Sequence, residues 1–314
     1  MANITPEPDD ILGTRPSGEG RAGAAQLLRA GLGFLRRHGL RAWLLAVLTL
    51  AILFWIMQLA FSPLLISQYL TQGFGSGFDW WWYAGPVVNI TAGAPFLAAY
   101  AYALLLLLQH RRAGATTLFG PFRSAALWAS TTMAGSAPFL VEWLVPRLRW
   151  WIPWSELQAG LVDENSLLAK AFRLIPVPEW LIHRLPHWIG ILLAIPLAWS
   201  ALNVLVLGTP GFRAITQSVR LARHHRRLAT LYLAAAVLLP LTLWVLAPLW
   251  NFANALNTGV ARDLLSGLAT LCSLFISSVT LLLESLVLVL VYREMVWRER
   301  EAEGPPLDSP AETA

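Results

Sequence analysis

Apolar residues along this chain gather into long runs that short basic segments separate. A helix that crosses the hydrocarbon core of a bilayer needs about 20 mostly apolar residues. Six stretches reach that length, at residues 40–66, 83–108, 125–145, 188–207, 228–250 and 264–292. The third is the least apolar, because it contains the small and polar run "STTMAGS". The pattern predicts an all-α fold, a polytopic membrane helical bundle of about six transmembrane helices.

The composition supports a membrane protein over a soluble one. Hydrophobic residues make up 56% of the 314 residues and charged residues 13%, against about 25% charged in an ordinary soluble domain. So few charges could not cover the surface of a soluble globule of this size. The single cysteine, Cys272, excludes an internal disulfide.

Basic residues are distributed unevenly between the two predicted sides of the membrane. Six arginines lie within residues 1–41, three within 111–123, five within 213–227 and three within 293–300, out of 23 basic residues. Loops that stay in the cytoplasm carry the excess of Lys and Arg. We therefore expect a multi-pass protein of a bacterial plasma (inner) membrane with cytoplasmic N- and C-termini.

The ends of the chain differ in composition from the rest. Residues 1–20 and 299–314 are polar and contain Pro and Gly, which predicts disordered cytoplasmic tails on either side of a membrane domain at 21–298. The longest loop of that domain, residues 146–187, contains recurring Leu, Ile and Trp. It is expected to cap the outer membrane surface with amphipathic helices, and the alternative is a lid over a central cavity.

Two segments lead from a basic amphipathic stretch directly into a predicted span. They are "GAAQLLRAGLGFLRRHGLRAWLL" and "GFRAITQSVRLARHHRRLATLYL". Helices of this kind lie in the membrane interface with their arginines toward anionic lipid. The predicted contacts with anionic lipid are Arg29, Arg36, Arg37, Arg213, Arg220, Arg223 and Arg227.

A fainter third copy begins at "GPFRSAAL", where Phe122 and Arg123 parallel Phe212 and Arg213. One interpretation is a threefold repeat of helical hairpins, with units at 22–110, 118–208 and 210–293. The alternative interpretation is that any six-span protein with basic inner loops looks periodic.

The runs "FRAITQSVRLARHHRRLATLYLAAAVLLPL" and "LVLVLVYREMVWRER" carry a resemblance to known proteins. In these runs and in length, the chain resembles uncharacterised bacterial six-helix membrane proteins, such as the membrane domain associated with glycerophosphoryl diester phosphodiesterases. The resemblance includes no catalytic motif. It implies a membrane scaffold and no particular chemistry.

Tryptophans cluster in "FDWWWY" and "RWWIPW", which fall on the same predicted outer side. An indole combines an apolar body with one N–H donor and settles where acyl chains meet headgroups. We expect the six to be interfacial anchors, and a surface that binds carbohydrate or lipid is the alternative. They are Trp80, Trp81, Trp82, Trp150, Trp151 and Trp154.

One carboxylate lies deep inside a predicted span. Glu284 is eight residues before Tyr292, the predicted inner end of the sixth span, and ionisable groups at such positions are functional candidates by default. Asn203, Asn89 and Ser278 are its candidate hydrogen-bond partners. Glu284 either joins two helices structurally or forms part of a proton or substrate pathway.

The sequence contains no motif for a catalytic, metal or cofactor site. The arginines follow membrane topology, so we expect lipid headgroups and no nucleic acid as partners, together with a partner membrane subunit or a homo-oligomer. The chain is thus predicted to be a non-enzymatic multi-pass membrane protein, a subunit or scaffold of an envelope or transport assembly. The alternative is a transporter or lipid-handling permease with Glu284 in its pathway.

Overall fold

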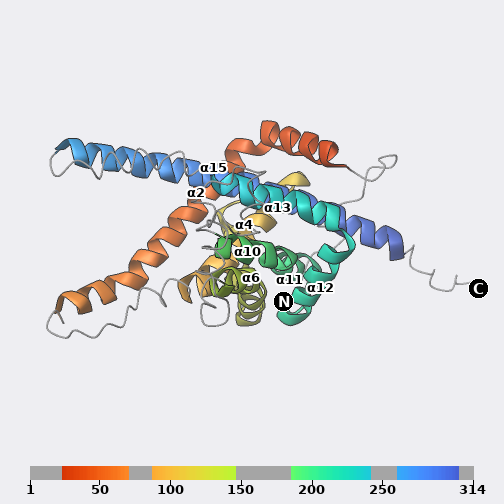
Figure 1. Cartoon of the computed structure of the whole chain (residues 1–314), viewed down its shortest axis with the longest axis horizontal. Helices are drawn as coiled ribbons and strands as arrows, with labels where there is room; N and C mark the ends of the chain where they lie inside the picture. The colour runs from red at the N-terminus through yellow and green to blue at the C-terminus, as the bar shows by residue number, and fades with distance from the viewer. Residues whose placement is uncertain (1–22, 71–86, 146–184, 242–259, 304–314) are drawn as a thin grey trace, which may run out of the picture.

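The computed structural model describes residues 23–70, 87–145, 185–241 and 260–303, and within these ranges it contains helices and no strand (Figure 1). The longer helices are α2 (Ala24–Leu70), α4 (Ala94–Leu108), α6 (Ala125–Leu144), α10 (Leu185–Ala194), α11 (Ser200–Leu207), α12 (Gly211–His224), α13 (Arg226–Leu241) and α15 (Val260–Glu303). Short turns connect them: the π-helical η1 (Asn89–Gly93), the helix α5 (Ala115–Leu118), and the 3₁₀ turns η2 (Gly120–Arg123) and η4 (Ile195–Leu197).

Within the described residues, four helical segments are long and apolar enough to cross a membrane. They are Ala24–Met57, Asn89–Leu108, Trp188–Leu207 and Gly267–Ala302. This confirms the prediction of a helical membrane protein. The predicted spans 83–108 and 188–207 end where α4 and α11 end. Gln109 terminates α4, and Gly208 terminates α11 in the left-handed conformation (φ 65°).

The other two predicted spans are not among these four. The segment 125–145 is indeed helical as α6, but its small and polar residues make it less apolar than the others. The segment 228–250 begins as α13, and its residues 242–259 lie outside the described part of the chain. The structure therefore shows four candidate spans where the sequence predicts six.

The composition of α6 allows its neighbours to approach closely. A Cβ atom added at Gly135 would lie 3.0 Å from the Cβ of Ala94 on α4 and 3.4 Å from that of Ala201 on α11. A Cβ atom at Gly190 of α10 would lie 3.1 Å from the Cα and the carbonyl oxygen of Glu142. Small residues at membrane helix interfaces permit such backbone contact, so α6 has the composition of a helix packed among other helices.

Proline positions coincide with breaks in the spans. The π-helical η1 immediately precedes Pro95, and η4 contains Pro196. Proline lacks the N–H that the carbonyl four residues earlier would accept. For Pro95 that carbonyl belongs to Thr91, and it accepts a hydrogen bond of 3.0 Å from the Trp128 indole. A side chain of α6 thus satisfies a backbone group that the break exposes.

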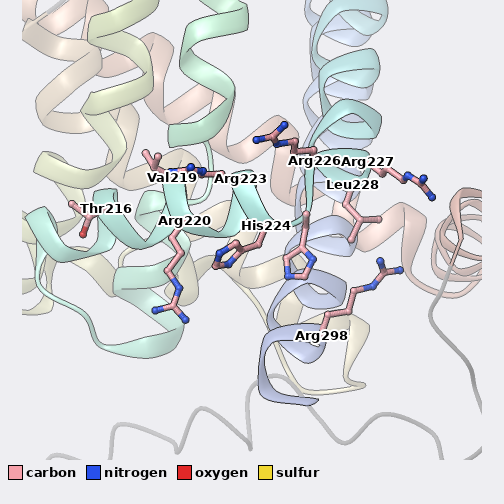
Figure 2. Close-up of a pocket in the computed structure, with 10 residues that line it drawn as sticks. Thr216, Val219, Arg220, Arg223, His224, Arg226, Arg227, Leu228 and Arg298 are labelled. Atoms are coloured by element: carbon pink, nitrogen blue, oxygen red, sulfur yellow. The ribbon is translucent and has the colours of Figure 1, made fainter. Parts of the chain in front are cut away.

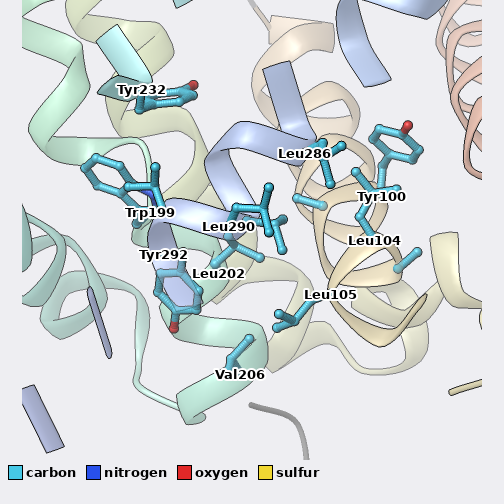
Figure 3. Packing of buried hydrophobic residues seen from close by; sticks show 14 of the residues in the cluster. Tyr100, Leu104, Leu105, Trp199, Leu202, Val206, Tyr232, Leu286, Leu290 and Tyr292 are labelled. Atoms are coloured by element: carbon cyan, nitrogen blue, oxygen red, sulfur yellow. The ribbon is translucent and has the colours of Figure 1, made fainter. Parts of the chain in front are cut away.

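The core is largest where α4, α11, α13 and α15 meet (Figure 3). Trp199 and Tyr232 are buried there, with ring centroids 5.4 Å apart. The indole N–H of Trp199 donates to the carbonyl of Leu288 over 3.2 Å and so ties α11's N-terminal end to α15. On the other side, the Tyr100 hydroxyl of α4 donates to the carbonyl of Ala42 on α2 over 3.2 Å.

Helix α12 packs on η4, α11 and α6. Its buried side consists of Gly211, Ala214, Ser218, Leu221 and Ala222, and the Ser218 hydroxyl donates to the carbonyl of Pro196 over 2.7 Å. Ile215 packs on this side as well, whereas Val219 is exposed.

The three predicted repeat units begin differently. Helix α2 runs without a break from its basic segment into the candidate span, whereas α12 ends at His224 before α13 begins. Phe122 and Arg123 lie in the 3₁₀ turn η2, whereas Phe212 and Arg213 lie in the first turn of α12. The described residues therefore give no support to the repeat.

The predicted domain limits also differ from the observed helices at one end. Helix α15 continues to Glu303, five residues into the segment predicted as a tail, because "REREAE" consists of good helix formers. Residues 1–20 and nearly all of the outer loop, 146–184, lie outside the described residues.

Candidate anion-binding basin

A basic hollow lies where α12 turns into α13, beside the C-terminal part of α15 (Figure 2). We call it the basin, and its volume is about 910 Å³. It is lined by Thr216, Val219, Arg220, Arg223, His224, His225, Arg226, Arg227, Leu228 and Arg298. Half of these ten residues are arginines, so the basin is a candidate site for an anion.

The fold brings these cations together from three helices. Arg220 and Arg223 belong to α12, Arg226 and Arg227 to the first turn of α13, and Arg298 to α15. The chain turns at His225, whose backbone carbonyl accepts hydrogen bonds from Leu228 and Ala229. Figure 2 shows Arg226 reaching back from α13 toward the part of α12 that carries Arg223.

Two carboxylates on α15 neutralise part of this charge. Glu299 accepts a hydrogen bond of 3.2 Å from Arg220 and lies 3.1 Å from Nδ1 of His224. Glu294 is buried and pairs with Arg298 over 2.7 Å, one helical turn away. The contacts of Glu299 link α15 to α12, whereas the Glu294–Arg298 pair lies within α15.

Three arginines of the basin have no such partner. Among the described residues, Arg223, Arg226 and Arg227 make no ion pair, and all three are exposed. Their charges are therefore available to an external anion. A guanidinium group offers paired N–H donors that match the oxygens of a phosphate or a carboxylate.

His225 lies at the back of this charged group. Burial lowers the pKa of its imidazole, Arg298 and His224 lower that pKa further, and Glu299 and Glu294 act in the opposite direction. Its Nε2 atom is buried and has no hydrogen-bond partner among the described residues. The side chain is thus held next to the basin in an environment that disfavours a further positive charge.

The predicted anionic-lipid contacts separate into two groups in the structure. Arg220, Arg223 and Arg227 line the basin. Arg213 is exposed at the start of α12, and Arg29, Arg36 and Arg37 are exposed along α2, outside the basin.

Sequence reasoning missed two cations of the basin. Arg226 was recognised only as one of several inner-loop arginines, although its position at the start of a helix could have singled it out. Arg298 is far from the others in sequence, and only the packing of α15 brings it to the basin.

The intramembrane carboxylate has a different partner from those predicted. The hydroxyl of Tyr232 on α13 donates to Glu284 on α15 over 3.3 Å. The amide of Asn203 donates to the carbonyl of Ala214 over 3.1 Å, and Ser278 accepts a 2.8 Å hydrogen bond from the indole of Trp43. Asn89 begins η1. The structure therefore does not bring these three residues to Glu284.

The remaining predicted site residues cannot be placed. Trp80, Trp81, Trp82, Trp150, Trp151 and Trp154 all lie outside the described residues. In the part of the chain that is described, no group of three or more His, Cys, Asp or Glu side chains is positioned to hold a metal ion.

The geometry of the basin suits the binding of an anion. It offers guanidinium groups, two histidines and two hydrophobic walls formed by Val219 and Leu228. Comparison of the chain with protein-family models, with curated proteins and with solved structures finds no match. The resemblance to bacterial six-helix membrane proteins therefore stays a prediction.

Proposed function

We propose that this chain is a non-enzymatic, multi-pass membrane protein whose basic side binds the headgroups of anionic lipids, and that it serves as a membrane subunit or scaffold of an envelope or transport assembly. The observation that carries the proposal is the basin, in which Arg223, Arg226 and Arg227 lack carboxylate partners within the described residues. Phosphate-bearing headgroups are the most abundant anions next to a membrane helix.

The proposal includes an orientation. With six spans in a bacterial inner membrane, the basin, the basic part of α2 and both termini would lie in the cytoplasm, according to the distribution of arginines. Reporter fusions after Arg112 and after Arg227 should then both be active on the inner side only. Activity on the outer side from either fusion would overturn the orientation and with it the placement of the basin.

Lipid preference tests the first half of the proposal. The full chain, purified in a neutral detergent, would be offered equal amounts of phosphatidylglycerol and phosphatidylcholine, and the lipid that copurifies would be quantified. We expect phosphatidylglycerol to be enriched at low salt and less so at about 0.5 M salt, because salt screens exposed charges. Equal retention of the two lipids by the unaltered chain would contradict the proposal.

Copurification tests the second half. A scaffold should remain with a stable partner chain, or with further copies of itself, when it is extracted in a mild detergent. A chain that behaves as a monomer without a stoichiometric partner, and that moves lipid or solute across a vesicle membrane, would favour the other function class.

That second candidate is a transporter or lipid-handling permease with Glu284 in its pathway. It is favoured by one observation, the carboxylate of Glu284 within a candidate span with the Tyr232 hydroxyl as its partner. Proteoliposomes that contain the chain would be assayed for solute uptake and for lipid translocation. A flux that is lost in Glu284→Gln supports this candidate, and no flux, or a flux that Glu284→Gln leaves unchanged, rejects it.

A further inference from the structure

The basin continues into an apolar groove. The groove has a volume of about 370 Å³ and shares three lining residues with the basin, Val219, Arg223 and Arg226. Its remaining walls are formed by Thr230 and by the apolar residues Leu192, Ile195, Pro196, Ala222, Ala229 and Leu233. A single continuous site therefore has a cationic end, an apolar end and two arginines at their boundary.

The apolar end offers few groups to a polar ligand. The donor of the one side-chain hydroxyl in its wall, that of Thr230, is used by a hydrogen bond to the carbonyl of Arg227 over 2.9 Å. Leu192 is 50% exposed on the candidate span Trp188–Leu207, so the groove opens on a surface that would face hydrocarbon. An acyl chain is the ligand segment that suits such walls.

The cationic end is formed by arginines on both sides of the turn between α12 and α13. Arg223 lies in the last turn of α12, and Arg226 is the first residue of α13. The two guanidinium groups therefore come from opposite sides of the turn at His225. Neither makes an ion pair among the described residues. A phosphate placed between them would accept charge-assisted hydrogen bonds from two directions.

We infer that the basin and the groove together form a discrete site for one anionic phospholipid molecule, with its phosphate between Arg223 and Arg226 and one acyl chain along the groove. This inference rests on the proposed function and makes it more specific, because a diffuse basic surface would need no groove. A soluble phosphorylated ligand would use the arginines alone and would gain nothing from the apolar walls of the groove, which disfavours it.

A second groove on the same helix provides a matched control. It lies between α2, α13 and α15, is lined by residues that include Gly31, Leu231 and Ala234, and has a volume of about 340 Å³. No arginine lines it. A lipid that only filled apolar space would enter both grooves, whereas a lipid held by its phosphate would prefer the first.

The test is a titration of the full chain in neutral detergent with dioleoylphosphatidylglycerol, followed by native mass spectrometry to count the lipids bound. We expect one saturable lipid on the unaltered chain. Arg223→Gln combined with Arg226→Gln should weaken it about tenfold or more, since two charge-assisted hydrogen bonds are lost. Arg112→Gln combined with Arg123→Gln removes the same charge from exposed positions outside the basin and should change the affinity less than about twofold.

A second pair of variants examines the groove. Thr230→Phe places a ring in the groove at an exposed position and should weaken the lipid about tenfold by filling the space of the acyl chain. Ala234→Phe, at an exposed position of the second groove, should have no such effect. Thermal unfolding curves for all four variants would show that each is folded.

The outcomes separate this inference from the proposed function. Equal weakening by both arginine pairs, or equal weakening by both phenylalanine variants, would leave anionic-lipid binding in place and reject the discrete site. Competition by inorganic phosphate at comparable affinity, with Thr230→Phe silent, would mean that the basin binds a free anion and would also reject it. A chain that retains phosphatidylglycerol no better than phosphatidylcholine would reject both proposals.

Discussion

The hydroxyl of Tyr232 on α13 donates a hydrogen bond to the carboxylate of Glu284 on α15 over a distance of 3.3 Å. This contact joins two helices that lie side by side (Figure 1), and the Tyr232 ring packs on Trp199 at the same place. The carboxylate thus has a structural role whether or not it has a functional one.

Tyr232→Phe should lower the free energy of unfolding by about 1 kcal/mol, because it keeps the packed ring and removes the hydroxyl that donates to Glu284. Reversible denaturation in mixed micelles would measure the change. Glu284→Gln retains an oxygen acceptor and should cost less. When Tyr232→Phe is added to Glu284→Leu, it should cause no further loss in the free energy of unfolding. If the losses of the two single variants add up in the double variant, the two side chains do not interact.

A second polar contact positions the basin. The Ser218 hydroxyl of α12 donates to the carbonyl of Pro196 in η4, so Ser218→Ala leaves a partly buried carbonyl without this donor. We expect a loss of about 1–2 kcal/mol in the free energy of unfolding and weaker binding of anionic lipid, since α12 carries Arg220 and Arg223. Thr216→Ala, whose exposed hydroxyl bonds only within α12, should be near neutral for stability. Equal losses in the two variants would contradict the assigned contact.

Sequence reasoning recovered the features that depend on local pattern. The predicted ends of two spans, at Leu108 and Leu207, coincide with the ends of α4 and α11. Polar residues directly follow the first apolar run, and a glycine directly follows the second. The sequence assigns three of the basin's arginines to anionic lipid, because the segment that leads into the predicted span is basic and amphipathic. In each case the signal lies within a few residues of the feature.

Features that depend on packing between helices were not recovered. Glu284 was assigned Asn203, Asn89 or Ser278 as partners on the basis of residue type, but the rotation of α13 presents Tyr232 instead. Arg298 is one residue of a long helix in sequence, and it joins the basin only because α15 passes beside the turn at His225. A span that is apolar on all sides carries no periodic signal for its orientation, so pairings of this kind cannot be read from the pattern.

The approach of α10 to α6 depends on a glycine. A Cβ atom at Gly190 would lie 3.1 Å from the Cα and the carbonyl oxygen of Glu142. Backbone atoms cannot relieve such a contact by changing rotamer, so Gly190→Ala should destabilise the fold by about 1–3 kcal/mol. Gly33→Ala, at an exposed position in α2 with nothing within 4 Å of the new atom, should instead stabilise it by about 0.5–1 kcal/mol. Thermal unfolding in detergent would compare the two. Stabilisation by both substitutions would show that the two helices are not in backbone contact.

His225 makes the stability of the basin dependent on pH. Because burial, the largest cause, lowers its pKa in the folded chain, the unfolded chain binds more protons near the ordinary value of about 6.5. Stability from this group is therefore fully present above about pH 6.5 and is lost as the pH falls toward the folded value. The charges that face the imidazole are those of Glu299, Glu294, Arg298 and His224.

His225→Gln removes the titrating group and keeps a polar side chain of similar length. The difference in melting temperature between about pH 7.5 and about pH 5.5 should then be smaller in His225→Gln than in the unaltered chain, with most of the change on the acid side. The comparison cancels the contribution of the other histidines and of the carboxylates, which titrate in both proteins. If the two proteins lose the same number of degrees on acidification, the imidazole is not held in a desolvated position. The turn between α12 and α13 would then be more open to water than the structure describes, which would also weaken the case for a shaped phosphate site between Arg223 and Arg226.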